Sequence, residues 1–141
     1  MENKICIFGL GYVGLPLAFA FSRRYPTIGF DTNKKRVDDL VRGIDKTLEF
    51  TKKQLISSKL RYASTKDELS DCNTYIITVP TPVNNNNEPV LTPLLKASET
   101  VGAVLNKDDI VIYESTVYPG ATENDCVPVL EKISGLKFNS D

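Results

Sequence analysis

The chain has 141 residues, of which 41% are apolar and 25% charged, so it is predicted to fold as one globular domain with its own core. Its 17 basic and 18 acidic side chains nearly cancel, which argues against binding to nucleic acid or to an anionic membrane. The apolar stretches are no longer than a strand and the N-terminus has no signal-peptide pattern, so we expect no membrane span and a cytoplasmic protein.

The first predicted elements are a buried strand over residues 4–8 and a helix that starts at Val13. Between them, Gly9, Gly11 and Gly14 form the G-x-G-x-x-G pattern of a dinucleotide phosphate site. Gly9 would permit the tight turn, Gly11 would let the backbone approach a pyrophosphate, and Gly14 would let the helix pack on the strand. The helix N-terminus would then offer N–H groups and a positive dipole to the phosphates. A glycine turn with a purely structural role is the alternative.

Asp31 ends the second predicted strand, 27–31, where an acidic side chain is placed to accept hydrogen bonds from an adenosine ribose. The same carboxylate would repel a 2′-phosphate, so NAD is favoured over NADP. Arg36 leaves this choice open, because a nearby arginine can accommodate that phosphate. The alternative for Asp31 is an ordinary turn or cap before the helix predicted over 34–41.

The rest of the chain alternates strand-like and helix-like segments, which is typical of a parallel sheet covered by helices. Further strands are predicted over residues 60–63, 74–79 and 110–113, with the start of a sixth at 136–138. Further helices are predicted over 52–56, from a capping box at Thr65 and Glu68, over 94–105, and from a cap at Thr122 to Gly135. The first helix is expected to bury Val13, Leu17, Ala18 and Phe21. The predicted fold class is α/β, a Rossmann-type doubly wound parallel sheet in three α/β/α layers over residues 1–141.

The chain contains three cysteines and no histidine. The cysteines lack C-x-x-C spacing, so we expect no disulfide framework and no metal site. Cys6 and Cys126 fall on apolar faces and are expected in the core, whereas Cys72 is the one expected to be exposed. None is expected to be a nucleophile, because no partner base is in view. Without histidine, the commonest general base is excluded within these residues.

Hydroxyl side chains follow two later strands, at the sheet edge where ligands bind in folds of this class. Thr81 and Pro82 come after the strand predicted over 74–79, and Thr116 comes after the one over 110–113. Both threonines can donate and accept hydrogen bonds toward a ligand. The alternative is that they satisfy the backbone of their own turns.

The motifs G-L-G-Y-V-G-L-P, V-P-T-P and E-S-T-V-Y-P-G-A-T-E, with Asp31 and Arg36, resemble the amino-terminal domain of the UDP-glucose/GDP-mannose dehydrogenase family. The similarity extends over the whole chain in order and spacing. The E-S-T-V-Y-P-G form most resembles the branch that acts on UDP-N-acetylhexosamines, such as the UDP-N-acetylglucosamine 6-dehydrogenases of bacterial polysaccharide synthesis.

This resemblance implies a two-step oxidation of a sugar C6 alcohol to a carboxylate, with two NAD+ as cofactor. It implies that Tyr12 and Val13 contact the pyrophosphate through backbone N–H groups, and that Asp31 and Arg36 hold the adenosine ribose. The cofactor-binding glycines of the resemblance are Gly9, Gly11 and Gly14.

The resemblance also implies roles at the reactive end of the site. Thr81, with Pro82 beside it, would contact the nicotinamide half of the cofactor. Thr116 is the implied catalytic residue and a cofactor contact, where it would help to hold a water and the substrate C6 region. Its hydroxyl is far from titrating, so its role is positioning and charge stabilisation.

The family's nucleophilic cysteine, in a G-x-C-x-P-K-D-type motif, and its substrate-binding lysine and asparagine come from later parts of the polypeptide. The chain is therefore interpreted as a fragment, the NAD-binding domain of a nucleotide-sugar 6-dehydrogenase, that binds NAD+ but does not oxidise a UDP-sugar alone. The full-length protein is expected to form a homodimer. The alternatives are a UDP-glucose 6-dehydrogenase, a non-catalytic NAD-sensing module, and another NAD dehydrogenase of this fold, such as a hydroxy-acid enzyme.

Overall fold

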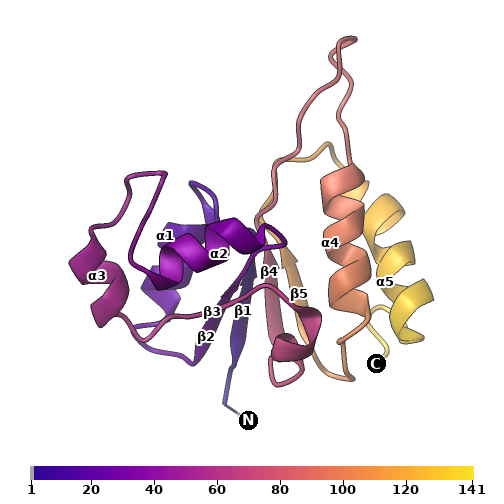
Figure 1. The fold of residues 1–141 in the computed structure, drawn as a ribbon. Coiled ribbons are helices and arrows are strands. Elements are labelled where there is room, and N and C mark those ends of the chain that lie inside the picture. Colours follow the sequence, from indigo (N-terminus) through magenta and orange to yellow (C-terminus); the bar gives the residue numbers. More distant parts are fainter. Residues whose placement is uncertain (1) are drawn as a thin grey trace.

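The computed structural model describes residues 2–141, which form a five-stranded parallel sheet in the order β3-β2-β1-β4-β5 (Figure 1). The strands are β1 (Ile5–Phe8), β2 (Thr27–Phe30), β3 (Arg61–Ala63), β4 (Thr74–Ile77) and β5 (Ile110–Tyr113). The helices are α1 (Gly14–Phe21), α2 (Lys34–Val41), α3 (Lys52–Ser57), α4 (Thr92–Gly102) and α5 (Val127–Ser134). A 3₁₀ turn, η1 (Lys66–Leu69), and a π-helical turn, η2 (Thr122–Cys126), complete them. Among residues 2–141, no helix is long and apolar enough to cross a membrane.

Helices cover both faces of the sheet, because the strands carry apolar side chains on both faces. In β1, Ile5 and Ile7 point to the layer that contains α1, α2 and α3, whereas Cys6 and Phe8 point to the layer that contains η1, α4 and α5. This alternation follows from the two-residue period of a strand. The doubly wound, three-layer α/β fold is confirmed.

Local capping fixes where several of the shorter helices begin. The Asn33 side chain accepts a hydrogen bond from the Arg36 N–H at 3.1 Å at the start of α2. The predicted capping box before η1 is confirmed, since Thr65 and Glu68 bind each other's backbone. Hydrogen bonds from Thr65 hold the pKa of Glu68 below its usual value.

Two predicted helix details are wrong. Val13 is 60% exposed, because α1 begins at Gly14 and turns Leu15 into the core instead; Ala18 is buried as predicted. Thr122 does not cap the last helix: within the described chain, the start of η2 has no side-chain capping hydrogen bond. The Asn124 N–H instead donates to the Gly120 carbonyl at 2.8 Å, so the backbone itself starts this helix.

Gly135 ends α5 as predicted, with a left-handed φ of 76°. The residues after it, 136–138, do not form the expected sixth strand. Their N–H groups donate to side chains, namely Ser134 Oγ, Asp141 Oδ2 and Glu131 Oε1. Because these donors are occupied by side chains of α5 and the tail, they do not pair with β5.

The segment between β4 and α4 forms a narrow arm that projects beyond the carboxyl edge of the sheet (Figure 1). Val83 and Pro89 pair across it in antiparallel fashion, and the Val90 N–H donates to the Pro82 carbonyl at 2.7 Å. At its tip, Asn84 Oδ1 accepts the N–H groups of residues 86 and 88 at 2.9 and 3.0 Å. The arm therefore has its own hydrogen-bonded structure.

We predict that Tyr75→Phe lowers the free energy of unfolding by about 1–2 kcal/mol, since it removes a buried hydrogen bond. The Tyr75 ring is fully buried and its hydroxyl donates to the Cys72 carbonyl at 3.0 Å. Urea denaturation measures the change. Tyr118→Phe is the matched control, because Tyr118 is 43% exposed and its hydroxyl bonds Asp125 at the surface. Equal losses in both variants would contradict this account.

Candidate functional site

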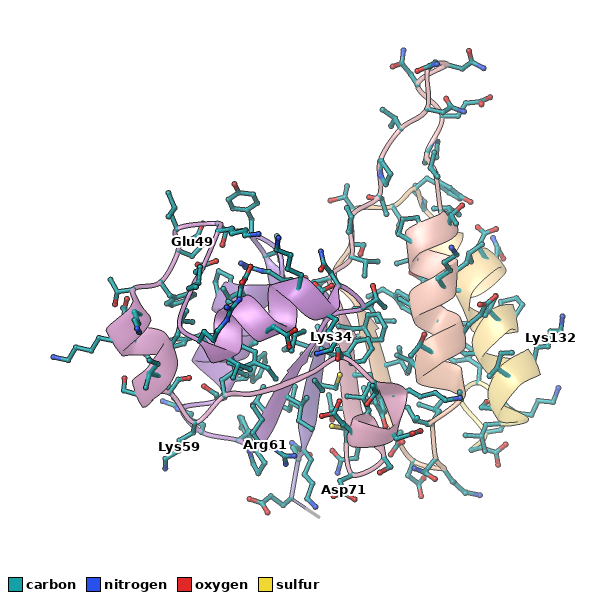
Figure 2. The ribbon with its side chains drawn as sticks, viewed as in Figure 1. Lys34, Glu49, Lys59, Arg61, Asp71 and Lys132 are labelled. Atoms are coloured by element: carbon teal, nitrogen blue, oxygen red, sulfur yellow. The ribbon has the colours of Figure 1, made fainter. Side chains whose placement is uncertain are left out.

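A cleft of about 970 Å³ opens at the carboxyl ends of the strands, where the strand order reverses between β1 and β4. Ligands bind at this position in open α/β sheets. Its volume lies at the upper end of the usual range for ligand pockets, about 300–1,000 Å³. The glycine turn after β1 forms its floor, the β2–α2 segment one wall and the start of α4 the other. Figure 2 shows Lys59, Arg61 and Asp71 at the opposite edge of the sheet, away from this cleft.

The three glycines of the turn meet different constraints. Gly9 has a left-handed φ of 102°, which an L side chain rarely adopts. A Cβ on Gly14 would lie 1.7 Å from the Gly9 carbonyl oxygen, so α1 can start here only at a glycine. A Cβ on Gly11 would have no neighbour within 4 Å, and Gly11 lines the cleft. Gly11 therefore leaves open the space that a ligand would fill.

The N-terminus of α1 is available to an anion. Val13 is the N-cap residue, and within residues 2–141 no side chain caps this end. Tyr12 and Val13 are 71% and 60% exposed on the turn, directly after Gly11, which lines the cleft. Uncapped N–H groups and the positive end of the helix dipole favour a phosphate at such a position.

Asp31 and Arg36 hold the two backbone polar groups of Leu10, the residue between the first two glycines. Asp31 Oδ2 accepts the Leu10 N–H at 2.9 Å, and Arg36 Nε donates to the Leu10 carbonyl at 3.0 Å. The other Asp31 oxygen accepts the Asn33 N–H at 2.8 Å. Both residues also line the cleft, so they shape the turn as well as face the ligand space.

Asp45, on the loop after α2, supports this arrangement by pairing with Arg36. Its side chain is fully buried and accepts a hydrogen bond from Arg36 Nη1 at 2.8 Å. It also accepts the N–H groups of Thr47, Glu49 and Phe50. Burial acts to raise the pKa of Asp45, but hydrogen bonds from Thr47 and Arg36 outweigh it and leave this pKa below its usual value.

Thr81 and Thr116 lie side by side, because the loops after β4 and β5 are joined by two hydrogen bonds. Thr81 Oγ1 donates to the Thr116 carbonyl at 2.6 Å, and Ser115 Oγ donates to the Val79 carbonyl at 2.6 Å. Thr81 is half-buried, whereas Thr116 and Pro82 are exposed. The sequence-based alternative, in which these hydroxyls satisfy turn backbone, therefore describes part of what Thr81 does.

The structure places four of the predicted site residues in the lining of the cleft and the other six outside it. Gly9, Gly11, Asp31 and Arg36 line the cleft. Tyr12, Val13, Gly14, Thr81, Pro82 and Thr116 lie outside the lining of the cleft, on the turn and on the joined loops.

Sequence reasoning missed two groups that organise the site. Asp45 stands in an unremarkable polar loop, and its only sequence signal is a D-x-T pattern after a glycine, which is typical of a local turn. Thr78 follows β4, and its hydroxyl donates to the Phe8 and Gly9 carbonyls at 3.1 and 2.8 Å. The sequence signal for Thr78 was a polar residue at the end of an apolar strand. Thr78 connects the glycine turn to the neighbouring strand.

All three cysteines are buried, so the prediction that Cys72 is exposed is wrong. Cys72 is only 4% exposed because η1 folds it against the sheet, beside Leu69 and Tyr75 in the same core cluster. Burial also raises the pKa of the Cys126 thiol. Among residues 2–141, no group of His, Cys, Asp and Glu side chains is placed to hold a metal ion.

The residues present fit an adenine dinucleotide. The open space at Gly11 lies beside an uncapped helix N-terminus, which suits a pyrophosphate. Asp31 stands at the tip of the adjacent strand, which suits a ribose with free hydroxyls. The cleft offers room for both on one continuous surface.

We predict that Gly11→Ala folds normally but loses affinity for NAD+, by about tenfold or more, because its methyl group occupies the ligand space. Gly14→Ala is expected to unfold the protein or to cost several kcal/mol, since its methyl group meets the Gly9 carbonyl. Thermal unfolding and calorimetric titration separate the two effects. A Gly11→Ala protein that binds NAD+ as tightly as the parent would contradict the assignment.

The lowered pKa of Asp45 predicts a pH-dependent contribution to stability. A carboxylate whose pKa is depressed on folding stabilises above its unfolded pKa, about 4, and loses this effect as the pH falls through its folded pKa. The difference in unfolding free energy between the parent and Asp45→Asn is thus largest at pH 6–7 and shrinks below about pH 4. Asp38→Asn, which breaks only the exposed pair with Lys34, is the control. A difference that does not change with pH would refute this origin.

The comparisons with known proteins agree with this geometry. The profile of the UDP-glucose/GDP-mannose dehydrogenase family, NAD binding domain, matches residues 3–141. The UDP-N-acetyl-D-glucosamine 6-dehydrogenases of Salmonella typhi and Pseudomonas aeruginosa are each 56% identical over 141 residues, which is 99% of this chain and 33% of each relative. The chain thus spans about a third of the length of the curated relatives it matches.

Among solved structures, a ternary complex of GDP-mannose dehydrogenase from Pseudomonas aeruginosa is similar, with a TM-score of 0.90 and 28% identity over 98% of this chain and 34% of that one. The fold, the glycine turn and the sequence similarity lead to one conclusion. The chain belongs to the UDP-glucose/GDP-mannose dehydrogenase family, as its NAD-binding domain.

Proposed function

We propose that this chain is the cofactor-binding part of an enzyme that oxidises the C6 alcohol of a UDP-N-acetylhexosamine to the uronic acid, for surface polysaccharide synthesis. UDP-N-acetylglucosamine is the proposed substrate. The observation that carries the substrate class is the 56% identity, over 99% of the chain, to two UDP-N-acetyl-D-glucosamine 6-dehydrogenases. The cleft with its open Gly11 supports the cofactor role. The same proposal holds that the full-length enzyme is a homodimer in the cytoplasm.

In this proposal the glycine turn and the residues of the cleft bind different parts of NAD+. The N–H groups of Tyr12 and Val13 bind the pyrophosphate above Gly11, and Asp31 binds the adenosine ribose. Arg36 supports the ribose end through the Leu10 carbonyl that it holds at 3.0 Å. NAD+ supplies the hydride acceptor when bound.

The joined loops after β4 and β5 form the proposed reactive end. Thr81 and Pro82 line the nicotinamide side, and Thr116 positions the substrate C6 region. The bond from Thr81 Oγ1 to Thr116 supports this role, because it holds the two loops together through the Thr116 carbonyl and does not use the Thr116 hydroxyl. Thr116 acts by holding and orienting, since a threonine hydroxyl does not titrate near neutral pH.

The chain alone is proposed to bind NAD+ without oxidising a sugar nucleotide. Its three cysteines are buried in the core, so none of them supplies the thiolate that such a reaction needs. The rest of the site would come from other parts of the full-length protein. Steady NADH formation from UDP-N-acetylglucosamine by the 141-residue chain would contradict the proposal that the chain alone cannot oxidise a sugar nucleotide.

Calorimetry with the isolated domain tests the cofactor site. NAD+ and ADP-ribose should bind with similar affinity, and NADP+ should bind at least tenfold more weakly, because Asp31 repels the 2′-phosphate. Asp31→Asn should narrow that gap by about tenfold. Equal affinity of the parent for NAD+ and NADP+ would contradict the proposed role of Asp31 in excluding the 2′-phosphate.

The full-length enzyme tests the substrate. Two NADH should form per UDP-N-acetylglucosamine consumed, with UDP-glucose oxidised far more slowly. Faster turnover of UDP-glucose would identify a UDP-glucose 6-dehydrogenase instead. NAD+ binding without turnover of any sugar nucleotide would identify a non-catalytic NAD-sensing protein.

A further inference from the structure

Asp31 and Arg36, which both line the cleft, favour opposite cofactors. Lys46 lines the cleft too and pairs with Asp39 at 3.2 Å. Asp31 repels a 2′-phosphate, whereas an arginine nearby is the usual means of accommodating one. Arg36 lines the same cleft, in the first turn of α2. The charges of Asp31 and Arg36 therefore act in opposite directions on NADP+ affinity, and the contacts of the guanidinium determine how far Arg36 offsets Asp31.

Each nitrogen of the Arg36 guanidinium already has an acceptor within the protein. Nε donates to the Leu10 carbonyl at 3.0 Å, Nη1 to Asp45 at 2.8 Å, and Nη2 to Thr47 Oγ1 at 3.4 Å. The Arg36 side chain is only 10% exposed. Its charge is paired with the buried carboxylate of Asp45, and these contacts hold its planar group in one orientation.

Asp45 is the fixed member of this pair. Its side chain is fully buried, and beside Arg36 it accepts hydrogen bonds from Thr47 Oγ1 at 2.7 Å and from the Glu49 and Phe50 N–H groups at 2.9 and 3.1 Å. Turning Arg36 toward a phosphate would leave this carboxylate buried without its cation, which is strongly unfavourable.

We propose that Asp45 determines cofactor specificity by locking Arg36 against the glycine turn, so that the arginine is not available to the 2′-phosphate of NADP+. This inference rests on the proposed placement of the adenosine ribose at Asp31. Asp45 itself touches no ligand and acts through Arg36. The site thus rejects NADP+ twice, once by the charge of Asp31 and once by withholding the arginine.

The test is the ratio of NADP+ to NAD+ affinity, measured by calorimetry on the folded domain. Asp45→Asn removes the charge that holds Arg36, and the ratio should rise by about tenfold as the guanidinium becomes free to pair with the phosphate. The double variant Asp45→Asn with Arg36→Gln should return the ratio to within about twofold of the parent. A general loosening of the loop would change both affinities together and leave the ratio unaltered.

Glu49→Gln is the matched control, because it removes the same charge from the same loop. The Glu49 side chain is exposed on the loop between α2 and α3 (Figure 2), and only its backbone N–H contacts Asp45. The ratio of NADP+ to NAD+ affinity in Glu49→Gln should equal that of the parent. An unchanged ratio in Asp45→Asn, or a rise that persists without Arg36, would overturn the proposal.

A measurement on the parent protein covers the case in which Asp45→Asn does not fold. The Arg36 Nε–H signal in a nitrogen-15 NMR spectrum should be protected from exchange and should not shift when NADP+ is added. A shift that saturates with NADP+ would show a free arginine and refute the lock. Absence of NAD+ binding to the parent would instead refute the proposed cofactor site, so the two failures are distinguishable.

Discussion

The candidate site depends on how Leu10 is held. Its side chain is 1% exposed and packs over Gly29 of β2, where a Cβ would lie 2.9 Å from it. Its N–H is bound by Asp31 and its carbonyl by Arg36. Since Leu10 stands between Gly9 and Gly11, these contacts orient the peptide groups on both sides of it. A turn of flexible glycines is thereby fixed before any ligand arrives, which lowers the cost of binding.

The order of the strands explains why residues so distant in sequence share this turn. The chain winds outward from β1 through β2 to β3, then crosses back to place β4 on the other side of β1. The tip of β1 is therefore flanked by the β2–α2 segment and by the end of β4. Asp31 reaches the turn from one side and Thr78 reaches it from the other. One central strand organises both walls of the cleft.

Much of this could be predicted from the sequence, because it depends on local pattern. Apolar runs located β1 and β4, and the glycine spacing located the turn with its strand and helix. The position of Asp31 followed from counting one more strand. These features need only the order of elements and the known twofold and 3.6-residue periods.

The features that were missed depend on contacts between distant segments. Asp45 matters because a loop folds back under α2, and no periodic pattern marks that path. Cys72 is buried by η1, and residues 136–138 lose their strand pairing because side chains capture their N–H groups. Val13 has an apolar side chain but an exposed position, since its backbone is used to begin α1.

The two hydrogen bonds between the loops after β4 and β5 have a consequence for motion. The base of the projecting arm contains Val79 and Thr81, and both are bonded to the segment at Ser115 and Thr116. Displacement of either segment alone would break these hydrogen bonds, so they couple the base of the arm to the segment that carries Thr116. A ligand that displaced the base of the arm would therefore act on the position of Thr116 as well.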